Sequence, residues 1–224
     1  MTIFALTDEL IFPDPGLANE DGLLAVGGDL SLERLLLAYQ HGIFPWYDNH
    51  SPILWWALNP RMVLFPNKFK VSKSLRQLIN KEIFEIRIDH NFKEVLDQCS
   101  LVPRKDQHGT WITDEMKNAY VNLFDYGFAH SVEAYLNQEL VGGLYGVAIG
   151  KIFYGESMFH LVNNASKVAF YYLIQKLNSL NYNLIDAQME TPLIKSLGGE
   201  LIPLEAYRTI LKSSIDNTNF QCKW

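Results

Sequence analysis

The sequence contains few of the residues that build disulfides or metal sites. It has only two cysteines in 224 residues, Cys99 and Cys222, which lie far apart and lack the spacing of metal ligands. None of its six histidines shares a helical ligand spacing with another. These absences exclude a disulfide framework and predict that the protein uses no metal and no other cofactor. They also suit a protein of the reducing cytoplasm.

Long apolar runs are missing as well. No stretch approaches the length of about 20 residues that a membrane-spanning helix needs. The opening stretch "MTIFALTDELIFPDP" lacks a basic region and carries Asp8 and Glu9, so it does not predict a signal peptide. With 48% hydrophobic and 20% charged residues, the chain can bury a sizeable core. We therefore expect a globular cytoplasmic protein without membrane contact.

Acidic residues are absent from residues 49–81, although the whole chain has a net charge of −6. The spacing places Lys68 and Lys70 on one side of an extended segment, and Lys73 and Arg76 on one helical face. An uninterrupted basic stripe in an acidic protein favours contact with a nucleic-acid backbone over the alternative of an ordinary solvated surface. The stretch contains six basic residues: Arg61, Lys68, Lys70, Lys73, Arg76 and Lys81.

Local signals near the N-terminus predict a small separate domain over residues 1–65. Ser31 is a typical helix N-cap, Leu32 and Leu35 begin an apolar face, and Gly42 marks the end of the helix. The aromatic segment that follows contains repeated X-Pro steps, which favour short strands and loops. Residues 66–224 then form the second domain.

The sequence of the second domain predicts a mixed α+β fold. Caps and apolar periodicity predict helices at residues 72–80, 91–100 and 113–126, followed by three antiparallel strands within residues 130–159. A long helix from Asn164, a strand over residues 182–188, and two short helices opened by Thr191-Pro192 and Pro203 complete it. This order of elements also occurs in N-acetyltransferases, an analogy at the level of fold alone.

Two acidic residues follow apolar strand residues and are candidates for chemistry. Glu156 and Asp186 lie where strands leave the core, and the ordinary interpretation is that they cap neighbouring helices. Gln188 lies two residues after Asp186, so on an extended chain its side-chain amide would touch the carboxylate. The neighbouring Ser157 is not in a Gly-x-Ser-x-Gly turn, which argues against a serine hydrolase.

The tryptophans allow two interpretations. Most tryptophans pack in cores or between domains, but the adjacent Trp55 and Trp56 cannot both face one core. At least one of them should be exposed or face a ligand. The alternative applies to Trp46, Trp55, Trp56 and Trp111 alike, because aromatic platforms beside a basic stretch suit stacking on bases.

Together these stretches resemble the leucyl/phenylalanyl-tRNA–protein transferase family. The similarity runs through nearly the whole chain: "GLLAVGGDLSLERLLLAYQHGIFPWY", "PILWWALNPRMVL", "GTWIT", "AHSVEAY", "LVGGLYGVAIGKIFYGESMF", "NASKVA", "LIDAQ" and "SLGGELIP". The resemblance implies a small N-terminal domain, a C-terminal N-acetyltransferase-like domain, and a monomer. It implies transfer of Leu or Phe from Leu-tRNA or Phe-tRNA to proteins with an N-terminal Arg or Lys, which marks them for N-end-rule degradation.

The resemblance also implies roles for particular residues. Trp46 and Trp111 would hold the terminal adenosine of the tRNA. Asp186 and Gln188 would handle the attacking amine, with Glu156 nearby, and both acids would attract a cationic acceptor. The basic residues Lys68, Lys70, Lys73, Arg76 and Lys81 would contact the tRNA. The pocket for the transferred side chain would be lined by Leu144, Met158, Phe170, Leu173 and Ile185.

The chain departs from the family pattern at three places, and two rival functions stay open. Ala187 stands where the family usually has Cys, and Leu193 and Leu204 stand where it often has His and Arg. An acyl-CoA N-acetyltransferase would need a Gly-rich pyrophosphate loop, but the corresponding stretch, "HLVNNASK", has no glycine. A binding module that does not react is the other rival, and turnover of charged tRNA separates it from an enzyme.

Overall fold

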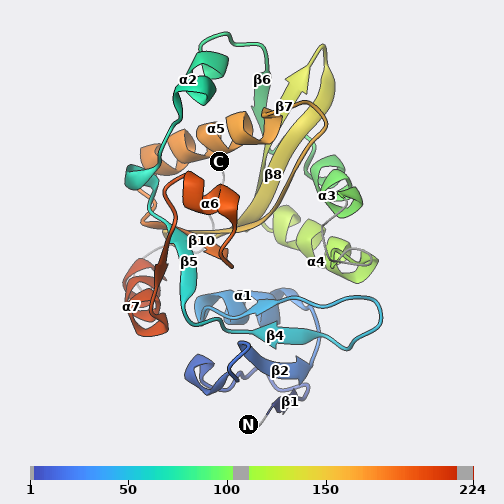
Figure 1. Ribbon diagram of the computed structural model, residues 1–224. Helices are drawn as coiled ribbons and strands as arrows, with labels where there is room; N and C mark the ends of the chain where they lie inside the picture. Colours follow the sequence, from blue (N-terminus) through green and yellow to red (C-terminus); the bar gives the residue numbers. More distant parts are fainter. Residues whose placement is uncertain (1–2, 103–110, 216–223) are drawn as a thin grey trace.

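A computed structural model describes residues 3–102, 111–215 and 224 (Figure 1). Cys99 is buried in the core, whereas Cys222 and His108 lie outside the described residues, so the prediction of no disulfide stays a prediction. Within those residues there is no cluster of three or more potential metal ligands. None of the helices described has the length and apolar character needed to cross a membrane.

A four-stranded sheet forms the N-terminal part of the molecule, and its strand order is β1-β2-β4-β3. Strands β1 and β2 are parallel, and the other neighbours are antiparallel. Helix α1 begins after Ser31, whose hydroxyl accepts a hydrogen bond from the Arg34 backbone N–H, as predicted. The elements are β1 (Phe4–Leu6), the 3-10 helix η1 (Pro15–Leu17), β2 (Leu23–Gly27), α1 (Leu32–Gln40), β3 (Phe44–Pro45) and β4 (Leu54–Trp56).

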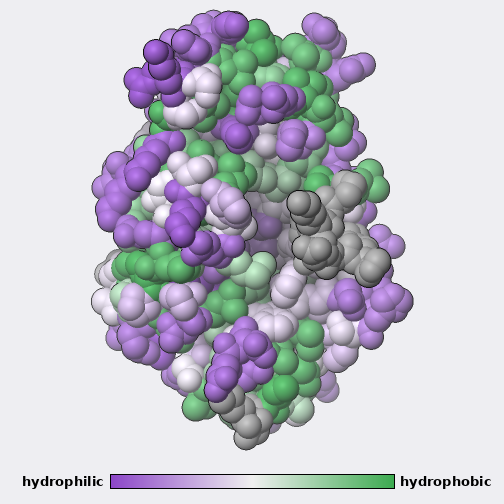
Figure 2. Space-filling model, viewed as in Figure 1, coloured by the Kyte–Doolittle hydropathy of each residue, from purple (hydrophilic) through white to green (hydrophobic). Residues whose placement is uncertain are grey.

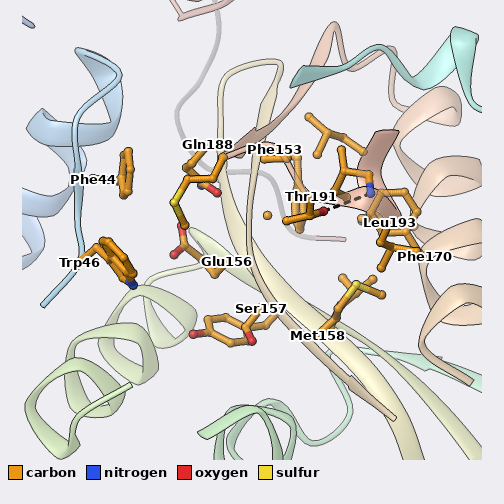
Figure 3. Close-up of a pocket in the computed structure, with 18 of the residues that line it drawn as sticks. Phe44, Trp46, Phe153, Glu156, Ser157, Met158, Phe170, Gln188, Thr191 and Leu193 are labelled. Atoms are coloured by element: carbon orange, nitrogen blue, oxygen red, sulfur yellow. Dashed lines mark hydrogen bonds between the residues drawn. The ribbon is translucent and has the colours of Figure 1, made fainter. Parts of the chain in front are cut away.

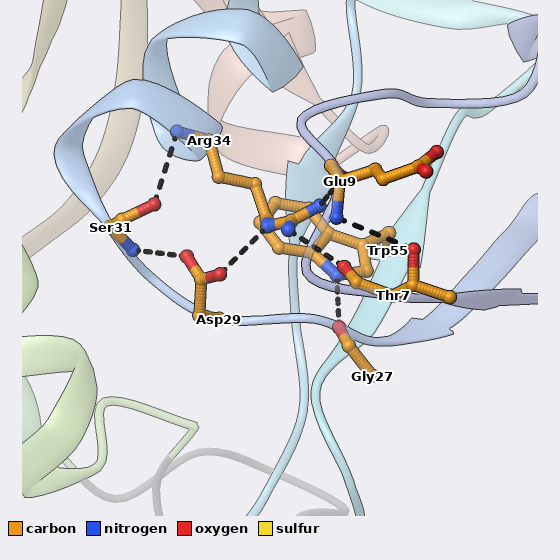
Figure 4. Close-up of polar contacts among 7 residues, drawn as sticks. All are labelled: Thr7, Glu9, Gly27, Asp29, Ser31, Arg34 and Trp55. Carbon is orange, nitrogen blue, oxygen red and sulfur yellow. Dashed lines mark hydrogen bonds and ion pairs between the residues drawn. The ribbon is translucent and has the colours of Figure 1, made fainter.

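A buried arginine on α1 binds the backbone of the segment that follows β1 (Figure 4). The Arg34 side chain is fully buried, and its guanidinium donates to the backbone carbonyls of Thr7 and Glu9 at 2.9 and 3.2 Å. It also donates to the Asp29 carboxylate at 3.2 Å. Because a buried charge is tolerated only when its donors are satisfied, this network fixes the path of the first strand relative to α1.

A seven-stranded sheet forms the rest of the fold, with the order β11-β5-β10-β9-β8-β7-β6. Its described neighbours are antiparallel except β9 and β10, which are parallel and joined through helix α5. Strand β8 lies near the middle and is buried along almost its whole length, as expected for a strand covered on both faces. The strands are β5 (Arg61–Leu64), β6 (Glu85–Ile88), β7 (Ala129–Leu136), β8 (Glu139–Ile149), β9 (Ile152–His160), β10 (Leu184–Gln188) and β11 (Glu200–Ile202).

Helices cover both faces of this sheet (Figure 1). One buried cluster joins α5 to one face, and a second joins α3 and α4 to the other face and continues into the N-terminal sheet. Helix α1 contacts α4, β8 and α7, so the two sheets share one apolar core. The remaining helices are η2 (Pro66–Lys68), α2 (Lys73–Ile79), α3 (Phe92–Leu101), α4 (Asp114–Asp125), α5 (Ala165–Ser179), α6 (Pro192–Ser196) and α7 (Leu204–Ile215).

The predicted α+β class is confirmed, and so are the three antiparallel strands and the caps at Ser31, Ser72 and Thr113. Strands β1, β2, β6 and β11 were not predicted. Strands β1, β6 and β11 lie at sheet edges, and β2 ("LLAVG") is an apolar run without alternation, which periodicity alone cannot assign. The final helix is longer than expected, with 12 residues. Strand β5 pairs with β10 and β11. The boundary at residue 65 therefore falls just after a strand of the larger sheet, and it stays a prediction.

Candidate active site

A cavity of about 490 Å³ opens between the N-terminal sheet and the point where β9 and β10 separate. The parallel pairing of these strands ends at Tyr154 and Asp186. Beyond that point β9 continues to His160 beside β8, while β10 bulges between Asp186 and Gln188. The molecular surface is hollowed near its centre in Figure 2, beside helix α6. The divergence of two neighbouring strands thus creates the site.

The cavity has an aromatic end, a polar middle and an apolar end (Figure 3). Phe44 and Trp46, from β3 and the segment after it, lie on one side of the view. Met158 and Phe170, from β9 and α5, lie on the opposite side, and Glu156 and Gln188 project between the two. Residues that line the cavity include Phe44, Trp46, Trp111, Leu144, Phe153, Glu156, Ser157, Met158, Phe170, Leu173, Ile185, Gln188, Thr191 and Leu193.

Trp46 is held in place by its neighbour on β4. The Trp56 indole N–H donates to the Trp46 backbone carbonyl at 2.7 Å, and the two rings meet edge to face with centroids 5.6 Å apart. Trp55 instead is fully buried and donates to the Gly27 carbonyl at 2.8 Å. Trp56 is half-buried and packs against the same core as Trp55, so the expectation that one of the pair would be exposed or face a ligand is not confirmed. Trp56 instead supports Trp46 at the aromatic end of the cavity.

Glu156 is the acidic side chain that reaches the cavity. Its two carboxyl oxygens each lie 2.8 Å from a phenol, Tyr39 on α1 and Tyr120 on α4. Removal from water raises the pKa of Glu156 to about 7, although the Tyr120 and Tyr39 hydroxyls act in the opposite direction. Burial also raises the pKa of both phenols well above 10, so they stay protonated. Glu156 therefore changes its charge near neutral pH.

Asp186 is fully buried behind the cavity and forms an ion pair with Arg61 of β5. Two guanidinium nitrogens donate to its two oxygens at 2.8 and 2.7 Å, and the Tyr207 hydroxyl donates at 2.7 Å. The guanidinium also lies over the rings of Phe44 and Tyr207, 4.7 and 5.0 Å from their centroids. Asp186 is thus neutralised by protein groups, which differs from its expected place beside a substrate amine.

Tyr207 reaches Asp186 because a glycine lies beneath its ring. Gly42 ends α1 with φ +75°, a conformation that favours glycine, as the sequence predicts. A Cβ atom at this position would lie only 2.5 Å from a carbon of the Tyr207 ring. The end of the first helix therefore also helps to position the phenol that holds the buried carboxylate.

Gln188 lies at the bulge of β10, and its contact with Asp186 is not the predicted one. Asp186 accepts a hydrogen bond from the Gln188 backbone N–H at 3.0 Å, not from the side-chain amide. The reason is that Gln188 has φ +55° and the register shifts there, so the two side chains no longer share one side of an extended chain. One end of the Gln188 amide faces the carbonyls of Ala187 and Gly155 at 3.0 and 3.1 Å, which identifies that end as NH2.

The predicted basic stripe is only partly a free surface. Arg61 is buried with Asp186, and Lys68 pairs with the Glu200 carboxylate at 2.7 Å. Lys68 also ends the 3-10 helix η2, not an extended segment, because Pro66 favours the first turn of a helix. The rest of the stripe lies on a hydrophilic surface that Figure 2 shows over α2. Its exposed members are Lys70, Lys73, Arg76 and Lys81.

Comparisons with known proteins show the family of the chain. The family model of the leucyl/phenylalanyl-tRNA protein transferase matches residues 63–212, and the model of that family's N-terminal domain matches residues 28–58. The chain belongs to this family. A leucyl/phenylalanyl-tRNA–protein transferase of Thermodesulfovibrio yellowstonii is 49% identical over 224 residues, which cover 100% of this chain and 91% of the relative.

Solved structures resemble the chain more distantly. The structure of L-PGS from Bacillus licheniformis has a TM-score of 0.45 and 14% identity, covering 85% of this chain and 63% of that one. A GCN5-related N-acetyltransferase from Kribbella flavida has a TM-score of 0.34 and 11% identity, covering 74% of this chain and 59% of that one. These likenesses concern the fold alone.

The structure gathers most of the side chains that the family resemblance singles out. Two of the three proposed catalytic residues, Glu156 and Gln188, reach the cavity, whereas Asp186 lies behind it. Leu193 lines the cavity, and Leu204 is buried with its backbone N–H bonded to Asn59. All seven proposed substrate-binding residues line the cavity: Trp46, Trp111, Leu144, Met158, Phe170, Leu173 and Ile185.

Sequence reasoning missed the residues that support these groups. From the sequence, Arg61 is interpreted as one more member of the basic stretch and Tyr39 as part of an apolar helix face, and Tyr120 is not singled out. Their contacts join residues 125, 117 and 36 positions apart. The one available signal for Arg61 was its place within the apolar strand "RMVL", where an unpaired charge would be costly.

Proposed function

We propose that this protein transfers Leu or Phe from aminoacyl-tRNA to the α-amino group of proteins that begin with Arg or Lys, and so marks them for N-end-rule degradation. The observation that carries the proposal is the order of surfaces along one cavity, from aromatic through polar to apolar. An aminoacyl ester has the same order, with an adenosine, an ester and an apolar side chain. Trp46 and Trp111 stack on the adenosine.

The apolar end of the cavity selects the transferred residue. Leu144, Leu173 and Ile185 are almost fully buried, and Met158 supplies a flexible wall that adapts to a branched or an aromatic side chain. A charged aminoacyl group would lose its hydration there without gaining a partner. Leu193, which replaces the usual His of the family, adds apolar surface to this end of the cavity.

The reaction is an aminolysis. The neutral acceptor amine attacks the ester carbonyl, a C–N bond forms, and the bond from the carbonyl carbon to the ribose oxygen breaks. An α-amine has an ordinary pKa of about 8, so a useful fraction is neutral at cellular pH and no strong base is needed. The protein therefore acts mainly by positioning the reactants.

Gln188 positions the attacking amine. Its NH2 group is anchored on the Gly155 and Ala187 carbonyls, so the amide oxygen is the end that accepts a hydrogen bond from the amine. Asp186 is a positioning residue, since it holds the Gln188 backbone N–H and is itself fixed by Arg61 and Tyr207. It does not attract a cationic acceptor, because its charge is already matched.

The exposed basic residues on and beside α2 bind the tRNA backbone. Lys73 and Arg76 lie one helical turn apart, Lys70 precedes the helix and Lys81 follows it, so together they contact successive phosphates. Lys68 would join them by exchanging its pairing with Glu200 for a phosphate, at little cost because exposed ion pairs are weak.

Radiolabelled Leu-tRNA and acetyl-CoA, each offered with a peptide that begins with Arg and the same peptide beginning with Ala, test the proposal. We expect leucine transfer to the Arg peptide alone and loss of transfer in Gln188→Ala. Acetyl transfer would instead support the acyl-CoA enzyme, and binding of charged tRNA without turnover would support the binding module.

Three further parts of the proposal rest on sequence signals and on family resemblance. The transferase works in the cytoplasm, works as a monomer, and divides into a small domain of residues 1–65 and a catalytic domain of residues 66–224. Sedimentation of the purified chain tests the monomer, because a dimer would double the sedimenting mass. Expression of residues 66–224 alone tests the boundary: a fragment that folds supports it, and a fragment that fails to fold because it lacks β5 between β10 and β11 contradicts it.

A further inference from the structure

Three oxygen-to-oxygen contacts close a ring at the polar middle of the cavity. Tyr39 and Tyr120 each lie 2.8 Å from one oxygen of Glu156, and their own hydroxyls are 2.7 Å apart. Each of these distances is that of a hydrogen bond between oxygens. A ring with three such contacts needs three hydrogens.

An ionised Glu156 leaves this ring one hydrogen short. If both phenols donate to the carboxylate, as their positions allow, the contact between the two hydroxyls has no hydrogen in it. Both oxygens would then face each other at 2.7 Å through lone pairs alone. If Glu156 carries a proton, each of the three groups donates once and accepts once, in either sense around the ring, and every contact is satisfied.

We propose that Glu156 rests as a neutral carboxylic acid, held by Tyr39 and Tyr120, and that it is the acid that protonates the leaving ribose oxygen. This inference rests on the proposed transferase function. Both phenols are fully buried, whereas Glu156 is half-buried and lines the cavity. Glu156 is therefore the member of the ring that a substrate can contact.

The charged and titratable groups around the ring are consistent with a neutral acid. Within the described residues, two charged side chains act on the pKa of Glu156: Asp186 raises it and Arg61 lowers it. Because Asp186 and Arg61 form an ion pair, their effects on Glu156 oppose each other. The remaining groups facing this region are phenols that stay protonated at neutral pH, and burial raises the pKa of Glu156 to about 7. They come from α1, α4, β9 and α7: Tyr39, Tyr120, Tyr154 and Tyr207. Tyr145 of β8 also lines the cavity, with its ring centroid 5.4 Å from that of Tyr120.

Glu156 both donates and regains the one proton that the reaction transfers. As the bond between the carbonyl carbon and the ribose oxygen breaks, the carboxyl hydrogen of Glu156 leaves the ring and moves to that oxygen, and the ribose hydroxyl leaves. The carboxylate that results accepts one hydrogen bond from each phenol, and the contact between the two phenols lacks a hydrogen until Glu156 is protonated again. The nitrogen of the new amide releases one proton, which returns Glu156 to its neutral form. The net change is amine plus ester to amide plus alcohol.

The resting proton can be observed without measuring activity. In protein labelled with carbon-13 at the glutamate side-chain carboxyls, the resonance missing from Glu156→Gln identifies Glu156. We expect that resonance to show a neutral acid at about pH 5.5, where ordinary glutamates are ionised, and to titrate near neutral pH. A Glu156 resonance that is already ionised at pH 5.5 would overturn the proposal.

The role as an acid is tested by changing the leaving group. Glu156→Gln keeps three hydrogens in the ring and stays neutral, but it cannot give up a proton. We expect leucine transfer from Leu-tRNA to fall by about 10²- to 10⁴-fold. Transfer from the 4-nitrophenyl ester of leucine, whose phenolate leaves without a proton, should stay within a few-fold of wild type.

The outcomes of this experiment distinguish a failure of the inference from a failure of the proposed function. Equal losses with both esters would mean that Glu156 only shapes the site, and unchanged transfer from Leu-tRNA would mean that the acid is another group. Either result overturns the inference while wild-type transfer keeps the proposed function intact. Absence of transfer by wild-type protein would overturn the proposed function itself, and with it the role of Glu156 as an acid.

Discussion

Replacing Glu156 with Gln should change how the stability of the protein depends on pH. The pKa of Glu156 is about 7 in the folded protein, compared with about 4.5 for an ordinary glutamate. Because the folded value is the higher one, the group favours folding below about pH 4.5, and this contribution is lost as the pH rises through 7. The amide of the Glu156→Gln variant has no such proton to lose, so the variant should lack this change.

The expected size follows from the difference between the two pKa values. At 1.36 kcal/mol for each pH unit, the gap between 4.5 and about 7 corresponds to about 3 kcal/mol. Glu156→Gln should therefore have nearly the stability of wild type at low pH, since its amide mimics the neutral acid. By pH 8 it should be more stable than wild type by about 3 kcal/mol.

Denaturant unfolding at several pH values between 5 and 8, followed by tryptophan fluorescence, measures this difference. All other titrating groups are common to both proteins, so their contributions cancel. Glu139→Gln, a change at an exposed glutamate at the start of β8, is the matched control and should differ from wild type by the same amount at every pH. A constant difference for Glu156→Gln over this range would refute a neutral resting Glu156.

Three further predictions concern the supports of the site. Tyr120→Phe removes one hydroxyl of the ring, so the carbon-13 titration of Glu156 should shift away from its wild-type midpoint. Arg34→Met leaves the Thr7 and Glu9 carbonyls without their buried donor and should cost about 2–4 kcal/mol in denaturant unfolding. The double change of Lys73 and Arg76 to Ala should make tRNA binding less dependent on salt, lowering the slope of log affinity against log salt by about 1.5.

Matched controls separate these effects from general damage. Tyr126→Phe changes an exposed tyrosine just after α4 and should leave the Glu156 titration unchanged. Lys93→Ala with Lys212→Ala removes two exposed charges outside the basic stretch and should leave the salt slope as it is. Equal slopes for the two double variants would contradict phosphate contacts on α2. Stability of Arg34→Met within about 0.5 kcal/mol of wild type would contradict the anchoring role of Arg34.

Local signals were enough for those parts of the fold that depend on nearby residues. Ser31, Ser72 and Thr113 each accept a backbone N–H three residues ahead, so their caps could be predicted from the sequence. Edge strands such as β11 could not be predicted in this way, because their pairing partners lie far along the chain. The residues of the apolar pocket came from family resemblance, and the cavity brings them together.

The contact between Asp186 and Gln188 shows why spacing alone was misleading. On an ideal strand, residues two positions apart, such as Asp186 and Gln188, have side chains on the same face. Here the bulge and the positive φ of Gln188 turn its side chain away from Asp186. The carboxylate then holds the backbone N–H instead. A backbone irregularity of one residue was enough to change the role assigned to Asp186.

The sequence by itself determined the secondary structure with local caps, the α+β class, the family and the chemical character of the pocket. Only the tertiary structure decided that Arg61 neutralises Asp186 and that Tyr39 and Tyr120 enclose Glu156. The physical reason is that charge state depends on burial and on partners brought together by folding, which for these residues are 36 to 125 positions away.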